Sequence, residues 1–359
     1  MLVLVLIVAV VVGRSILKDR AETNRVNEVL QEAKALNDDG KIQNGIELDQ
    51  EQLQGVLNRT TSAKETENRA LLLKTLAYAK AEGDYNVNQT IIDHVIKVNT
   101  RPSIRADIFK TVMTRRKAIE NVAPLLAYAK STQENESAAA AIQAALSSAT
   151  GQPADDYIDD FLNLISDSDS STVRGAAERA AATLIAQSDS KDDFVIPILS
   201  AYKTAIDDSA KFAMLRLLGA TGGDKAAKAV TQALKSDSTV TASAALAALG
   251  NWADDSQFNT LIEYLESEDD QGLRKKAFDS SYAFLRNGRK RDPDAAGEMW
   301  KSLAKNASSQ SEKLQIISGM ANQKHAWAIT ILDDFINDTD DRVIDKAEQA
   351  KRIVERKLR

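Results

Sequence analysis

A chain of 359 residues is long enough for about two domains or for one elongated repeat array. It has no cysteine, which excludes a disulfide framework, a thiol nucleophile and an iron–sulfur cluster, and its 15 glycines and 5 prolines are too few for a turn-rich β-sandwich or a disordered chain. The excess of 52 acidic over 46 basic residues gives a net charge of -6, which does not favour nucleic acid as the main partner.

The chain opens with an unbroken apolar run, Met1–Gly13, which the basic residues Arg14, Lys18 and Arg20 follow. Such a run is typical of a membrane segment, although a spanning helix usually takes about 20 apolar residues. We therefore predict a single-pass bacterial membrane protein in which residues 1–20 are a transmembrane anchor or a signal segment. Whether this segment is cleaved, or is the end of a longer anchor, stays open.

The orientation of this protein depends on the charges around the apolar run. Under the positive-inside rule the cations after the run would keep the body in the cytoplasm, whereas a basic segment upstream would reverse the orientation. The absence of cysteine does not separate the two compartments. We favour a periplasmic, that is extracytoplasmic, body over a cytoplasmic one.

The segment that follows, residues 21–54, is interrupted by the turn residues Asn37–Gly40, so we expect a juxtamembrane helix and a polar loop. Residues 55–118 are expected to form N-terminal helical repeats. Within them, residues 71–102 have a weaker resemblance to tetratricopeptide repeats, carried by Leu71–Asn86 with its Gly-Asp-Tyr turn. These repeats are therefore either tetratricopeptide-like or similar to the repeats that follow.

From about residue 24 onward the apolar residues recur at spacings of three and four, and no segment alternates as a strand would, so we predict an all-α chain. The helices come in pairs that recur about every 34 residues, which is typical of a solenoid. Five equivalent apolar positions, Ile104, Val173, Val240, Leu273 and Val343, are separated by 69, 67, 33 and 70 residues. The second helix of each pair is rich in alanine, and we expect these second helices at Glu67–Ala79, Ser103–Thr114, Glu136–Ala149, Ser171–Leu184, Ala210–Thr221, Thr241–Trp252, Gly272–Leu285, Glu312–Ala321 and Asp341–Val354. First helices with larger apolar residues are expected at Asp156–Ser166, Asp193–Ile206, Ala226–Ser236 and Gln257–Ser267.

Serine and aspartate cluster just before several second helices, within Ser166–Ala177, Lys235–Ala245, Glu266–Ala277 and Asn337–Ala347. Their side-chain oxygens can accept hydrogen bonds from the unpaired first amides of a helix, and each such cap contributes about 1 kcal/mol. The turns inside the pairs are therefore predicted to be N-caps.

The segment Asp169–Ala181 holds an acidic turn residue, the pair Val173-Arg174 and four alanines at helical spacing. This pattern resembles the HEAT repeat family, and the pair Leu273-Arg274 repeats it after its own acidic turn. Other second helices match it in part, because their arginine is displaced or missing. The resemblance covers residues 119–359 and implies an α-α superhelix, that is, a HEAT-like α-solenoid, with the expected membrane-anchor helix at its N-terminus.

Two acidic clusters are candidates for a metal or catalytic site. Residues Asp167–Glu178 place oxygen atoms at the spacing of a calcium-binding loop, but Thr172 stands where that loop needs glycine, so a capped helix turn is favoured. The carboxylates of Asp155–Asp160 open a first helix, where they complement the helix dipole. Neither cluster predicts a paired general acid and base.

Catalytic motifs are not recognisable elsewhere. The two histidines, His94 and His325, are far apart in the sequence and have no second histidine at a metal-ligand spacing. The chain has no phosphate-binding loop, dinucleotide fingerprint or nucleophile elbow. We therefore predict that the protein is not an enzyme and that it uses no cofactor, metal or small-molecule substrate.

Stacked helix pairs expose a long surface that suits protein partners. We predict a membrane-tethered scaffold or adaptor that binds other proteins on this surface, and a membrane through its N-terminal helix. The candidate partner-binding residues are basic: Arg174 and Arg274 on second helices, and Arg286, Arg289, Lys290 and Arg291 after one of them.

Alternatives remain open at this point. Arg174 and Arg274 could instead bond to acidic turns of neighbouring repeats and serve stability. The protein could also be a HEAT-like enzyme, a nucleic-acid-binding array, or a purely structural envelope protein. Basic residues also cluster at Arg115–Lys117 and along Lys351–Arg359. Nucleic acid is disfavoured because the clusters at Arg115–Lys117 and Arg286–Arg291 follow second helices and so lie in loops.

Overall fold

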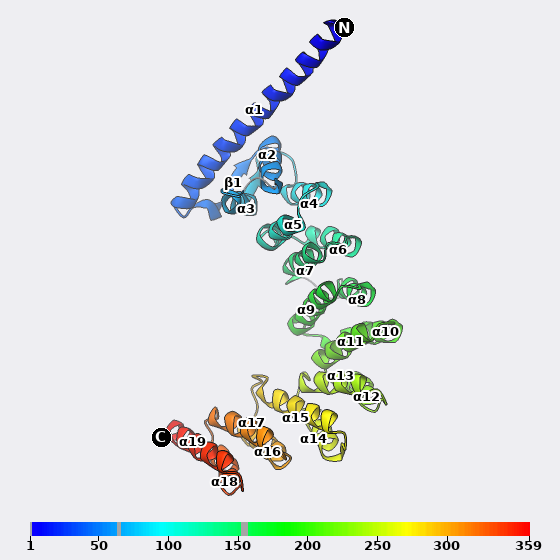
Figure 1. The fold of residues 1–359 in the computed structure, drawn as a ribbon, viewed down its shortest axis with the longest axis vertical. Coiled ribbons are helices and arrows are strands. Elements are labelled where there is room, and N and C mark those ends of the chain that lie inside the picture. The colour runs from blue at the N-terminus through cyan, green and yellow to red at the C-terminus, as the bar shows by residue number, and fades with distance from the viewer. Residues whose placement is uncertain (1, 63–65, 152–156) are drawn as a thin grey trace. The chain divides into compact units, whose positions relative to one another are not determined.

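The computed structural model describes residues 2–62, 66–151 and 157–359, with residues 2–19 described by their backbone (Figure 1). In these residues nearly all of the regular secondary structure is helical. The chain divides into two compact units, Met1–Leu184 and Ile185–Arg359, and the boundary falls within helix α9 (Ser171–Gln187).

The N-terminal unit begins with the helix α1 (Leu2–Asp38), which covers both the expected anchor and the expected juxtamembrane helix. In the described part of the chain no helix combines the length and the apolarity needed to cross a membrane. The predicted single-pass membrane location, with a spanning anchor helix in residues 1–20, is therefore wrong. The physical reason is the length of the apolar run, because Leu2–Gly13 spans only about 18 Å as a helix before Arg14 introduces charge, against about 30 Å of hydrocarbon.

Two short strands follow in this unit and are the exception to the all-α prediction, which holds for nearly all of the described secondary structure. β1 (Ile46–Leu48) and β2 (Ala79–Ala81) pair in parallel, with Ile46 opposite Ala79. Each strand has only three residues, which is too short for alternation to be recognised in a sequence. The segment compared with tetratricopeptide repeats is accordingly helical only as far as Tyr78, where α3 (Arg69–Tyr78) ends and β2 begins.

The rest of the N-terminal unit is made of helix pairs. The first helices α2, α4 and α6 adjoin one another in that order, as do the second helices α3, α5 with its continuation η2, and α7. The last turns of the expected helix Ser103–Thr114 form a π-helix. The bounds are η1 Ile42–Asn44, α2 Gln50–Thr61, α4 Val87–Lys97, α5 Pro102–Ile108, η2 Phe109–Met113, η3 Ile119–Asn121, α6 Val122–Ser131, α7 Asn135–Ala149 and α8 Ile158–Asp167.

The C-terminal unit repeats one arrangement. Each first helix packs on the second helix of its pair, and the second helices α11, α13, α15, α17 and α19 pack successively on one another (Figure 1). The expected second helices are confirmed to within a few residues. The bounds are η5 Lys191–Phe194, α10 Val195–Thr204, α11 Asp208–Thr221, α12 Gly223–Leu234, α13 Thr239–Gly250, α14 Phe258–Ser267, α15 Gln271–Arg286, α16 Pro293–Lys305, α17 Gln310–Ala321, α18 Trp327–Ile336 and α19 Asp341–Leu358.

The predicted N-caps explain why the second helices begin where they do. The side chains of Ser238, Asp270 and Asp340 accept hydrogen bonds from backbone amides in the first turns of α13, α15 and α19. Ser309 and Glu312 form a capping box at the start of α17. Alanines and leucines of the second helices are buried between the pairs, so neighbouring pairs complete each other's core.

Candidate functional site

Arg174, the first of the predicted partner-binding residues, bonds to the helix that precedes it. Its Nη2 donates to the carbonyl oxygen of Ser168 at 2.8 Å, and its Nε donates to that of Ile165 at 3.3 Å. Both carbonyls belong to the C-terminal end of α8 and the turn after it, where a helix leaves carbonyl groups unpaired. Arg174 therefore joins the two helices of one pair.

Arg274 joins two neighbouring pairs. Its guanidinium forms an ion pair of 2.9 Å with Glu312 on α17 and donates to the carbonyl oxygen of Asn306 at 2.7 Å. The Arg274 side chain is 17% exposed and that of Glu312 only 7%. Burial acts to raise the pKa of Glu312, but the backbone amides of Ser309 and Ser308 and the charge of Arg274 outweigh it and lower that pKa. Arg274 thus stabilises the packing of its helix pair against the next one.

A third arginine has the same role and was not singled out from the sequence. Arg105 on α5 donates to the carbonyl oxygens of Val95 at 2.9 Å and Val98 at 2.8 Å, both at the end of α4, and pairs with Glu134 before α7. The signal was present, since the pair Ile104-Arg105 occupies the place of Val173-Arg174 in its repeat. Arginines near the start of three second helices therefore form one structural series.

In the basic loop after α15, two of the arginines also bond within the protein. Arg289 and Arg291 pair with Asp255 at 3.2 and 2.9 Å, and their guanidinium carbons lie 4.7 and 5.2 Å from the ring centroid of Phe284. Arg291 is 6% exposed and donates to the carbonyl oxygen of Phe284 at 2.8 Å. Lys290 between them is exposed. The ion pairs with Asp255 and the contacts with the Phe284 ring therefore fix both arginine side chains within the protein.

The structure gives the six predicted residues different surroundings. Arg174, Arg274, Arg289 and Arg291 bond to the protein itself, whereas Arg286 and Lys290 remain exposed. Arg286 also lies over the ring of Tyr282, 5.6 Å from its centroid. Of the two arginines for which a stabilising role was left open, Arg274 pairs with an acidic residue of the neighbouring pair and Arg174 bonds to carbonyls of its own pair; their binding to a partner stays a prediction.

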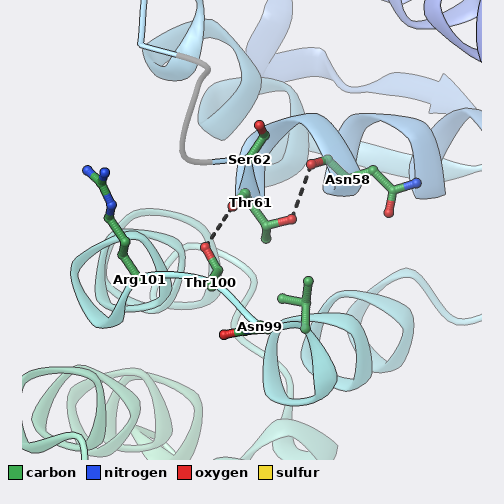
Figure 2. A pocket seen from close by; sticks show the side chains of 7 residues that line it. Asn58, Thr61, Ser62, Asn99, Thr100 and Arg101 are labelled. Carbon is green, nitrogen blue, oxygen red and sulfur yellow. Dashed lines mark hydrogen bonds between the residues drawn. The ribbon is translucent and has the colours of Figure 1, made fainter.

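A polar hollow of about 440 Å³ lies between the end of α2 and the turn from α4 to α5 (Figure 2). Figure 2 shows the Thr100 hydroxyl donating to the backbone carbonyl oxygen of Thr61 at 2.7 Å, and the Thr61 hydroxyl directed to that of Asn58 at 3.2 Å. Asn99 and Arg101 lie at its rim. The hydrogen bond between Thr100 and Thr61 thus joins α2 to the turn before α5, so these polar groups of the hollow are already paired within the protein.

His94 lies beside this hollow, between α2 and α4. The side-chain nitrogen of Gln54 is 2.8 Å from Nδ1 of His94, and Nε2 is 3.3 Å from the Thr61 hydroxyl. Because an amide nitrogen can only donate, Nδ1 accepts, which assigns the ring proton to Nε2. Burial lowers the pKa of His94, so the neutral ring is favoured in the folded chain. His94 therefore lies between two helices and bonds to residues of α2.

The second helices of the N-terminal unit form a groove of about 610 Å³. It runs along α7 from Asn135 to Leu146, a length of about 16 Å at the rise of an α-helix. Its floor is made of small side chains: Ala139 and Ala140 on α7, and Ala176 and Ala180 on α9. The groove exists because these side chains end at Cβ.

The rim of this groove is polar. On one side Lys110 of η2 lies 3.7 Å from Glu136, so these two charges offset each other. On the other side Arg179 is exposed, and no hydrogen bond or ion pair of its guanidinium is found within the part of the chain that the structure describes. Gln143 and Thr172 add exposed neutral polar groups. The groove thus combines an apolar floor with one uncompensated positive charge.

The acidic residues considered from the sequence do not come together into a site with other metal ligands in the described residues. Asp155 and Asp156 lie outside those residues, and Asp159 and Asp160 are exposed in the first turn of α8. His325 stacks on Trp327 with a centroid separation of 5.7 Å. Of the two hollows described above, the groove between α7 and α9 has the larger volume, about 610 Å³ against about 440 Å³.

Comparisons with known proteins add little to this picture. No family model matches the chain, and no curated protein matches it in sequence. Among solved structures, human deoxyhypusine hydroxylase in complex with glycerol is similar over 85% of this chain and 96% of its own, at 12% identity and a TM-score of 0.30. A likeness at that TM-score and identity establishes neither a shared fold nor a shared activity.

Proposed function

We propose that this protein is a non-enzymatic scaffold of the HEAT-like helical-repeat type, and that it binds a protein partner in the groove between α7 and α9. The observation that carries the proposal is the groove itself: about 610 Å³, lined from η2, α7 and α9, with an alanine floor and a polar rim. Binding sites for other molecules are commonly concave, apolar at the base and polar at a few points.

The succession of helix pairs supports the same proposal. In each unit second helices adjoin second helices, so side chains from several helices line one surface. Repeats built in this way present extended surfaces to partners. The arginines that bond within and between pairs, such as Arg105 and Arg274, keep these helices in register. Such a protein acts by holding its partner in place, and its own residues form or break no bond.

The experiment is proximity labelling in living cells with the full chain. The wild-type protein is expected to label a discrete, recurrent set of neighbours. The variant Ala139→Trp, which fills the groove, should lose most of that set. The matched control is Ala127→Trp, at an exposed alanine of the first helix α6 in the same unit, and it should keep the set.

Two results would overturn the proposal. One is a diffuse set of neighbours that does not recur between experiments, as expected of a structural component without a specific ligand. The other is a discrete set that Ala139→Trp leaves unchanged while circular dichroism shows the variant folded, because the partner would then bind elsewhere.

A further inference from the structure

The shape and charge of the groove between α7 and α9 bear on what it can bind. The lining positions on α7 are 135, 136, 139, 140, 143 and 146, which lie on one face of that helix. The groove is therefore straight over about 16 Å, the length of about three helical turns. A straight partner segment of this length fits it without bending.

The alanine floor favours a helix in this place. Ala140, Ala176 and Ala180 are at most 8% exposed, so they are packed closely together. At these three positions the floor presents only methyl groups. Small residues in a groove let another helix approach closely and insert its larger apolar side chains. An amphipathic helix meets such a groove with residues at positions i, i+3, i+4 and i+7.

The charge of the groove selects among amphipathic helices. Lys110 and Glu136 offset each other, while Arg179 is exposed and uncompensated in the described part of the chain. A partner with a carboxylate beside its apolar stripe would pair with Arg179, whereas a basic residue there would be repelled. Gln143 and Thr172 can bond to either kind of partner and do not discriminate.

We infer that the occupant of this groove is an amphipathic helical segment of a partner protein, with large apolar residues on the alanine floor and an aspartate or glutamate opposite Arg179. This inference rests on the proposed scaffold function and deepens it. The specificity of the groove then depends on two features of the partner: the spacing of the apolar residues along its helix and the sign of one charge.

The test uses a yeast-displayed library of 16-residue helical peptides as its probe, selected against the full chain. Four positions at i, i+3, i+4 and i+7 are randomised, together with the positions that flank them. On the wild-type protein the selected peptides should carry large apolar residues at the four positions and an acidic residue at one flank. Selection on Arg179→Glu should change that flank to lysine or arginine, and a peptide selected on wild type should bind this variant about tenfold more weakly.

Ala139→Trp serves as the second variant, because Ala139 is partly exposed and its replacement leaves the buried floor alanines in place. Selection on it should enrich none of the wild-type sequences. The inference is wrong if the library converges on nothing, if the selected flank charge does not follow residue 179, or if Ala139→Trp changes nothing. If the labelling experiment finds recurrent neighbours but the selection fails, the scaffold function stands and the acidic helix is rejected. If the selection succeeds but no neighbours recur, the scaffold function is rejected.

Discussion

A Cβ atom placed on Gly219 of α11 would lie 2.5 Å from the carbonyl oxygen of Ala248 on α13. The obstacle is the backbone of the neighbouring second helix, which cannot rotate away as a side chain can. The same relation recurs one pair later, where a Cβ atom on Gly250 of α13 would lie 2.9 Å from the carbonyl oxygen of Ser280 on α15. These second helices reach their spacing because both positions lack a side chain.

The first prediction concerns Gly219→Ala. The added methyl group must push α11 and α13 apart, so we expect the variant to lose about 1–3 kcal/mol of stability. The matched control is Gly175→Ala on α9, where the nearest atom is a terminal nitrogen of the flexible Arg179 side chain at 3.4 Å. Alanine there should be neutral or stabilising by up to about 1 kcal/mol, because it favours the helix. Urea unfolding followed by circular dichroism distinguishes the two, and equal effects would refute the close-packing account.

The second prediction concerns the pH dependence conferred by Glu312. Its pKa is lower in the folded chain than in the unfolded chain, so the folded chain binds fewer protons between those two values. The stability that Glu312 contributes is complete above the unfolded value of about 4.3 and is lost as pH falls through the folded value. Glu312→Gln should remove this part of the acid sensitivity and cost about 1–3 kcal/mol at pH 7, because Arg274 loses its anion.

Stability curves from pH 7 to pH 3 measure this effect. The exposed residue Glu263 on α14 provides the control, since Glu263→Gln should leave the curve unchanged. If Glu312→Gln keeps the acid sensitivity of the wild type, the buried pair with Arg274 is not its source.

The third prediction separates the neighbours Lys290 and Arg291. Arg291→Ala removes a nearly buried guanidinium that pairs with Asp255 and donates to the Phe284 carbonyl, so it should cost about 2 kcal/mol and lower the thermal midpoint. Lys290→Ala alters an exposed residue in the same loop and should change stability by less than about 0.5 kcal/mol. A large loss for Lys290→Ala, or none for Arg291→Ala, would contradict the structural role of this loop.

The fourth prediction concerns His94. Burial lowers its pKa, so as pH falls below about 6.5 the unfolded chain takes up a proton that the folded chain does not, and stability decreases. His94→Gln should flatten stability between pH 7 and pH 5.5. With two histidines in the chain, the ring signals in a proton NMR titration can be assigned by this variant alone. A His94 signal that titrates at or above 6.5 would contradict the partly buried, neutral ring.

Much of this fold could be predicted from local patterns. The second helices were found because Ser238, Asp270 and Asp340 mark their starts and alanine recurs along them, and both signals act over a single turn or two. The strands were missed because three residues carry no period, and their pairing joins Ile46 to Ala79 across 33 positions. Local patterns contain no information about such a pairing.

The candidate site was harder to predict for a different reason. The sequence showed that Arg174, Arg274 and Arg291 are basic, but it did not show that their charges are already used by Ser168, Glu312 and Asp255. That depends on which helix ends lie within reach. The groove is marked in the sequence only by the alanines Ala139, Ala140, Ala176 and Ala180. They do not stand out there, because alanine recurs along most second helices and is mostly buried.

The most direct test of the proposed scaffold function is site-specific photo-crosslinking in cells, with a photoreactive phenylalanine analogue in place of Gln143, which lines the groove, or of Ala127, which is exposed on α6. The account predicts discrete protein adducts from position 143, their loss when Ala139→Trp is added, and none of these adducts from position 127. Absence of adducts at position 143, or the same adducts from both positions, would contradict it.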